Sequence, residues 1–158
     1  MNQTTQIANR FREVILDGLW VSNTNFKDQI ADLTWKQATT QIDALNTIAA
    51  LTFHINYYIK GVLNVFEGGT LDIRDRYSFD CPPINSQKDW DALRNEMWNN
   101  AEKFAALIKA MPDEKLDEVF VDKKYGTYRR NINGMIEHSY YHLGQITLIK
   151  KMIVMKFS

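Results

Sequence analysis

Apolar residues recur at spacings of three and four along most of the chain, which is the period of a helix with one buried face. Four segments keep this period over about 18–25 residues each, and no stretch reads as a convincing strand. Four helices of this length are typical of a four-helix bundle, so we expect an all-α protein. The predicted helices cover residues 5–22, 46–67, 86–110 and 131–155.

The ends of the predicted helices carry recognisable signals. Asn46 is a candidate N-cap for the second helix, and the glycine pair at 68–69 suits its left-handed end. Pro112 stops the third helix. Residues 34–37 have the sequence pattern of a capping box, which predicts one short helical turn outside the four long helices.

Two connections are less regular. Residues 68–85 are too many for a tight antiparallel link between the second and third helices, so we expect at least one crossover. Residues 119–121 and 127–128 flank a Lys-Lys-Tyr-Gly turn, and this pattern predicts a small β-hairpin.

Length and composition limit the possibilities. The 158 residues fit one domain, spanning 1–158. Nineteen Lys and Arg balance nineteen Asp and Glu, which argues against a nucleic-acid partner. No apolar run approaches the length of a membrane span and no signal peptide is visible, so we expect a cytoplasmic protein without membrane contact. The lone Cys81 suits a reducing compartment.

The three histidines are the residues most informative about chemistry. His138 and His142 are four residues apart on the fourth helix, where they share a face and can share a metal ion. The alternative for this pair is a polar stripe bonded to neighbouring helices. His54, in the second helix, is by itself more simply a hydrogen-bonded core residue. Together, three neutral imidazoles with one open position form a common catalytic zinc arrangement, although nickel, iron and manganese also accept imidazole.

Other metal and nucleophile motifs do not fit. A di-iron bundle requires Glu three residues before each histidine, but Met135 and Ser139 occupy those positions. Ser139 also breaks the His-Glu-x-x-His pattern of metalloproteases. The sequence has no covalent haem motif, phosphate-binding loop or nucleophile elbow.

Over nearly the whole chain, the order of these motifs resembles the DinB-like superfamily. The resemblance rests on His54 within Leu-Thr-Phe-His-Ile-Asn-Tyr-Tyr and on Glu-His-Ser-Tyr-Tyr-His-Leu-Gly-Gln at residues 137–145. It implies a four-helix bundle with a long connection between helices two and three. It also implies that His54, His138 and His142 bind a divalent metal ion, usually zinc or nickel, with water completing the coordination. Relatives include putative metal-dependent hydrolases, bacillithiol transferases and mycothiol-dependent isomerases.

We therefore expect a metal-dependent hydrolase or a small-thiol S-transferase acting on a small molecule. A non-catalytic metal-stabilised scaffold or small-molecule binding protein is the alternative, and a carboxylate such as Asp17 or Glu96 closing the site would favour it. Near the histidines, Tyr58 and Tyr141 are candidates to reach a substrate, with packing as the simpler role. Gln145 would orient a ligand or water, or else bond to another helix.

Two further sets of residues are less specific. Four arginines near the predicted ends of the bundle would receive an anionic substrate, although surface salt bridges explain them more simply: Arg74, Arg76, Arg129 and Arg130. The four tryptophans are expected in core and edge packing: Trp20, Trp35, Trp90 and Trp98. Because aromatic residues are numerous for one small bundle, we expect a homodimer formed through exposed aromatic helix faces.

Overall fold

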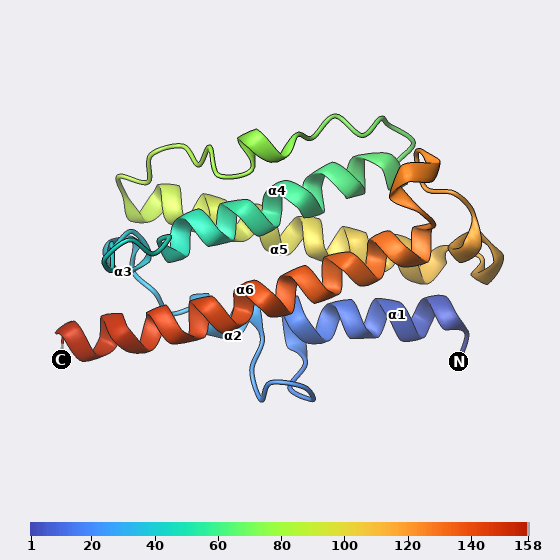
Figure 1. The fold of residues 1–158 in the computed structure, drawn as a ribbon. Coiled ribbons are helices and arrows are strands. Elements are labelled where there is room, and N and C mark those ends of the chain that lie inside the picture. Colours follow the sequence, from blue (N-terminus) through green and yellow to red (C-terminus); the bar gives the residue numbers. More distant parts are fainter. Residues whose placement is uncertain (158) are drawn as a thin grey trace.

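The computed structural model describes residues 1–157, and this part of the chain is helical with no strand. Its long elements are α1 (Gln3–Arg12, continued by the π-helical turn Glu13–Asp17), α4 (Ile48–Phe66), α5 (Gln87–Ala110) and α6 (Tyr128–Phe157). Both α1 and α4 pack against α5 and against α6, so the four helices enclose one core (Figure 1). The predicted all-α bundle is therefore confirmed.

The long connection after α4 is the expected crossover. Figure 1 shows α4 and α5 running in the same direction, opposite to α1 and α6. The chain between α4 and α5 therefore returns along the length of the bundle, with one short 3₁₀ turn at Asp75–Tyr77. Two short helices, α2 (Phe26–Ile30) and α3 (Trp35–Ala38), lie in the connection between α1 and α4.

Side-chain caps explain where several helices begin. Thr47, one residue after the predicted Asn46, caps α4 by accepting a hydrogen bond from the backbone N–H of Ala50 (3.1 Å). Ser86 caps α5 in the same way. The predicted capping box is present at α3, and the helix α4 is followed by Gly68 at a φ of 92°, where glycine is preferred.

The prediction of one helix over residues 5–22 is wrong at its end. The π-helical turn is the last helical element before Gly18, which is extended, and the Asn25 side chain donates to the Gly18 carbonyl. A Cβ at Gly18 would lie 2.3 Å from the Cα of Glu13, so this exit needs glycine. The apolar residues that follow continued the helical period but lie in an exposed loop: Leu19, Trp20 and Val21 are 56%, 87% and 65% exposed.

The tryptophans therefore divide between the core and the surface. Trp90 is fully buried, and its indole N–H donates to the carbonyl of Leu33 (2.9 Å). Trp35 and Trp98 are partly buried against the core, as expected for edge packing. Trp20 contradicts the expectation, because it lies outside the core on the loop after α1.

The predicted hairpin is reduced to a single antiparallel bridge between Val119 and Thr127. The 3₁₀ turn Lys123–Tyr125 occupies the space between its two arms. Thr127 then accepts a hydrogen bond from the backbone N–H of Arg130 (3.2 Å), as an N-cap does. This cap starts α6 at Tyr128, three residues before the predicted start, and leaves too few residues for a second strand.

The core of the bundle is aliphatic and aromatic. Its ring contacts include the edge-on pair Phe11 and Phe104, with centroids 5.0 Å apart, which joins α1 to α5. Phe66 of α4 meets Phe104 at the same distance. None of the described helices is both long and apolar enough to cross a bilayer.

Candidate metal centre

The three histidines come together between α4 and α6. The Nε2 atom of His138 lies 3.1 Å from Nε2 of His54 and 3.0 Å from Nε2 of His142. One ligand atom from each ring can be chosen so that all three lie within 4.8 Å of one another. The helical period places His138 and His142 on one face of α6, and the packing of α4 against α6 supplies His54.

Hydrogen bonds on the far side of two rings orient these nitrogens. His54 Nδ1 lies 3.2 Å from the carbonyl oxygen of Ser78, and His142 Nδ1 lies 2.6 Å from Oε1 of Gln145. Both oxygens only accept hydrogen bonds, so each Nδ1 carries the hydrogen and each Nε2 keeps a free lone pair. At least two lone pairs therefore face the centre of the cluster, which is an arrangement that suits a metal ion.

Burial keeps these imidazoles neutral. Loss of hydration, with repulsion from His142 and His54, lowers the pKa of His138 to about 4. The pKa values of His54 and His142 are also lowered, first by burial. Neutral imidazole is the form that binds metals, so the cluster is ready for a cation at neutral pH.

The crossover connection forms one side of the site. Ser78 is buried and supplies the carbonyl that holds His54, while the ring of Phe79 stacks on His54 with centroids 3.9 Å apart. Asp75 accepts a hydrogen bond from the hydroxyl of Tyr58 (2.9 Å). None of these three loop residues was predicted from the sequence, because an irregular segment has no period that would reveal which side chains turn inward.

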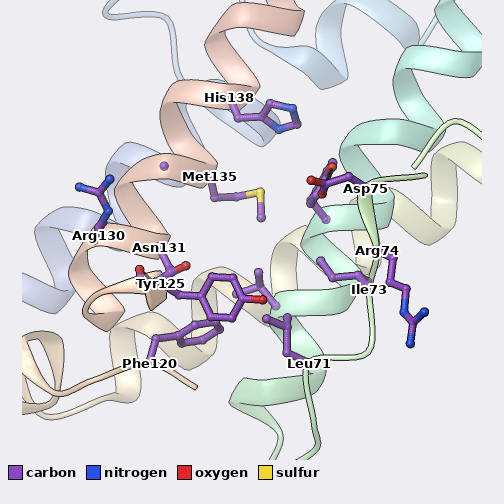
Figure 2. Close-up of a pocket in the computed structure, with 13 residues that line it drawn as sticks. Leu71, Ile73, Arg74, Asp75, Phe120, Tyr125, Arg130, Asn131, Met135 and His138 are labelled. Carbon is purple, nitrogen blue, oxygen red and sulfur yellow. Dashed lines mark hydrogen bonds between the residues drawn. The ribbon is translucent and has the colours of Figure 1, made fainter. Parts of the chain in front are cut away.

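A cleft of about 650 Å³ opens beside the cluster, and His138 is part of its wall. Figure 2 shows His138 at one end of the cleft, with Met135 between it and the aromatic pair Phe120 and Tyr125. Because pockets for small molecules have volumes of roughly 300–1,000 Å³, this cleft is of suitable size.

The three candidate residues near the histidines lie in different places relative to the cleft. Tyr58 lines the cleft, and its ring meets that of His138 edge-on at 5.2 Å. Tyr141 stacks edge-on against His142 but is 65% exposed and does not line this cleft. Gln145 holds His142, as described above.

The two carboxylates considered as additional ligands are engaged elsewhere. Asp17 pairs with Arg12 (2.5 Å), and Glu96 pairs with Lys60 (2.8 Å). Within residues 1–157, the histidine cluster includes no carboxylate and no thiol. Cys81 is half-buried, and burial raises the pKa of its thiol.

The four arginines also separate. Arg129 forms an ion pair with Asp117 (2.9 Å), and Arg76 lies over the ring of Tyr77. Arg74 and Arg130 line the cleft instead. Arg129 therefore has the predicted surface salt bridge, Arg76 has a ring contact in its place, and the other two border the site.

An all-α bundle with three converging imidazoles between two helices defines a class of protein with a metal-compatible histidine centre. A family model described as the DinB superfamily matches residues 23–146, a range that includes all three histidines. The chain belongs to the DinB superfamily. No curated protein and no solved structure matches the chain significantly.

Proposed function

We propose that the protein is a metal-dependent enzyme, either a hydrolase or a small-thiol S-transferase, that uses His54, His138 and His142 as the ligands of one divalent ion. The observation that carries this proposal is the convergence of three Nε2 atoms, one of which belongs to His138 in the wall of a cleft. Zinc or nickel is the expected ion, because the resemblance to the DinB-like superfamily implies one of these two, and both accept neutral imidazole. When bound, such an ion supplies Lewis-acid chemistry for a water, a thiol or a carbonyl group.

An open coordination position favours an enzyme over a metal-stabilised scaffold. Structural zinc sites are closed by four protein ligands, whereas catalytic sites keep three ligands and one free position. The cluster offers three imidazoles, and Asp17 and Glu96 are bound to other side chains. Both facts support the catalytic alternative.

The chain's own residues would position the ligands and the substrate. The Ser78 carbonyl and the Gln145 amide fix two of the rings, which limits their freedom to turn away from the ion. Tyr58, held by Asp75, presents a hydroxyl group at the cleft wall beside His138. A substrate in the cleft would lie against both Tyr58 and His138.

The proposed setting is a cytoplasmic homodimer acting on a small molecule, with no nucleic-acid partner. The balanced charge supports the last point. Exposed apolar side chains at Trp20, Tyr141 and Leu148 support contact with a second copy.

Metal content tests the proposal first. Untagged protein, measured by inductively coupled plasma mass spectrometry, is expected to hold about one divalent ion per chain. His138→Ala and His142→Ala should hold none, while Tyr141→Phe, a change beside His142 but outside the cleft, should keep the parent's content. A parent protein that contains no ion and takes up none on titration would contradict the proposal. Esters, amides and thiol conjugates are the substrates to screen on the loaded protein.

Metal removal should weaken the fold without abolishing it. An ion that binds only the folded chain stabilises it by about 2.7 kcal/mol at a free concentration 100 times its Kd. A chelator is therefore expected to lower Tm while the far-ultraviolet circular dichroism stays helical, because the apolar core remains. A fully unfolded chelated protein would mean that the ion, rather than the core, holds the bundle together.

A further inference from the structure

We propose that the cleft beside His138 binds an elongated small molecule with an apolar body and an anionic end, lying along α6 over Gly134. The reacting end would face the histidines and the anionic end would face Arg130. The proposed function is needed only to say where the reaction occurs, because binding in the cleft does not depend on the metal ion.

One face of α6 forms the floor of the cleft. Arg130, Gly134 and His138 all line it, and their spacing of four residues places them on the same side of the helix. At about 1.5 Å per residue, Arg130 and His138 are roughly 12 Å apart along the helix axis. A ligand that touches both must therefore be elongated.

Gly134 leaves the middle of this floor bare. No atom lies within 4 Å of the position that a Cβ would take there, so packing does not require glycine. Glycine inside a helix also costs about 1 kcal/mol relative to alanine. In contrast, a Cβ on Gly61 of α4 would lie 2.4 Å from Ile73, which lines the cleft, so Gly61 has a packing reason. The space over Gly134 is available to a ligand.

The walls around this floor are mostly apolar. Met135 lies between His138 and the aromatic pair Phe120 and Tyr125, and aliphatic residues stand opposite them (Figure 2). Such walls favour an apolar body, because burying its surface is worth roughly 25 cal/mol per Å². The aliphatic residues are Val62, Leu71 and Ile73.

The charges at the opening favour an anion. Arg74 and Arg130 lie on opposite sides of the cleft in Figure 2, and both are exposed. Within residues 1–157, neither guanidinium group has an ion-pair or hydrogen-bond partner, whereas Arg129 pairs with Asp117. The one carboxylate in the lining, Asp75, already accepts a hydrogen bond from Tyr58. The lining therefore carries two guanidinium charges against one carboxylate charge, which leaves it net positive.

A pair of fluorescent probes with the same apolar body tests this charge preference. Anilinonaphthalenesulfonate carries a sulfonate group, and phenylnaphthylamine is its neutral counterpart. Both are titrated into the full-length protein, metal-loaded and metal-free. The sulfonate is expected to bind about two- to fivefold more tightly in both forms, as an exposed ion pair allows.

Two matched pairs of variants assign the binding to this cleft. Gly134→Leu should weaken both probes about tenfold by filling the floor, without loss of thermal stability, because leucine is the better helix former. Gly144→Leu is its control, since Gly144 also lies on α6 with open space at its Cβ position but lines a different cavity. Arg130→Gln should remove most of the preference for the sulfonate, whereas Arg76→Gln, outside the cleft, should keep it.

The proposal is overturned if the parent binds both probes equally, or if the two members of either variant pair have the same effect. Metal content separates this result from a failure of the proposed function, because Gly134→Leu and Arg130→Gln leave all three histidines in place. A metal-loaded protein with no charge preference would overturn the inference alone. A protein that binds no metal but shows the expected preference would support the inference and overturn the enzyme.

Discussion

Two buried polar side chains on α4, two residues apart, have different surroundings. Asn56 is 3% exposed, and its amide donates to Glu96 of α5 (3.1 Å) and accepts from Asn100 of the same helix (2.9 Å). Glu96 in turn accepts from Lys60. The amide's donor and acceptor sides both find partners, so the protein closes this cluster by itself.

His54 is buried to a similar degree, at 6% exposed, but its cluster does not close. Its Nδ1 is satisfied by Ser78, and its Nε2 faces the Nε2 atoms of His138 and His142. At least two lone pairs compete for at most one hydrogen atom there. Burial alone therefore does not distinguish a structural polar residue from a functional one. The distinguishing feature is whether all the hydrogen-bonding groups of the residue find partners within the protein.

Metal affinity should differ strongly between variants of the two clusters. His54→Ala should weaken metal binding by more than about 100-fold, because loss of a residue that merely orients a ligand already costs roughly 10–100-fold. Asn56→Ala should leave metal affinity unchanged. Isothermal titration with zinc into chelator-treated protein measures both. Equal zinc affinities for the two variants would mean that His54 is no more a metal ligand than Asn56 is.

The second effect concerns the residue that orients His142. Gln145→Leu removes the acceptor of the Nδ1 hydrogen bond, so metal affinity should fall about 10–100-fold while the three ligands stay in place. Tyr141→Phe is the control, because it keeps the ring that contacts His142 and removes only a hydroxyl group. If Gln145→Leu bound zinc as tightly as the control, the glutamine would have no part in the site.

The third effect measures the closed cluster. Asn56→Ala removes the acceptor of the Asn100 amide and leaves Glu96 with Lys60 as its remaining partner, which should lower the free energy of unfolding of the metal-free protein by about 1–3 kcal/mol. Urea denaturation measures this loss. Asn64→Ala, near the exposed end of α4, is the control and should cost less, since water can replace its bond to the Thr70 carbonyl. Equal losses would mean that the Asn56 cluster contributes no more than a surface contact.

The sequence predicts the helical part of the molecule well because a helix repeats. The period locates α4, α5 and α6 to within a few residues, and it places His138 and His142 on one face. It does not bring His54 to them, since that contact depends on how α4 packs against α6. The resemblance to the DinB-like superfamily supplied that step.

Helical periodicity could not predict the contacts of the irregular segments. The crossover reaches the site through tertiary contacts, such as the Tyr57 hydroxyl, which bonds to both the backbone N–H and the carbonyl of Arg74. No local pattern foretells that Ser78 and Phe79 turn towards His54. The apolar period also predicted the wrong end for the first helix, because Leu19 continues the spacing beyond the point at which the helix has ended.

A third polar group, the surface carboxylate of Asp113, also finds its hydrogen-bond partners within the protein, but it carries a charge. The carboxylate of Asp113 accepts hydrogen bonds from the backbone N–H groups of Gln3 and Thr4, both at 2.9 Å, at the start of α1. These bonds hold the pKa of Asp113 below its usual value of 3.8. The folded chain therefore binds this proton less readily than the unfolded chain. The stabilisation is present above pH 3.8 and is lost as pH falls through the lowered pKa.

Loss of the Asp113 charge should change stability less than any of the substitutions above. Asp113→Asn should destabilise the protein slightly at pH 7, because the amide keeps one acceptor and loses the charge. The difference from the parent should shrink as pH falls below about 4, when the parent's carboxylate also becomes neutral. Thermal unfolding of both proteins at pH 7 and near pH 3 measures this. Asn56→Ala, whose lost side chain does not ionise, provides the contrast. If the loss of thermal stability caused by Asp113→Asn were the same at pH 7 and near pH 3, the charge of Asp113 would contribute nothing to stability. The contact would then act through neutral hydrogen bonds alone, as the Asn56 cluster does.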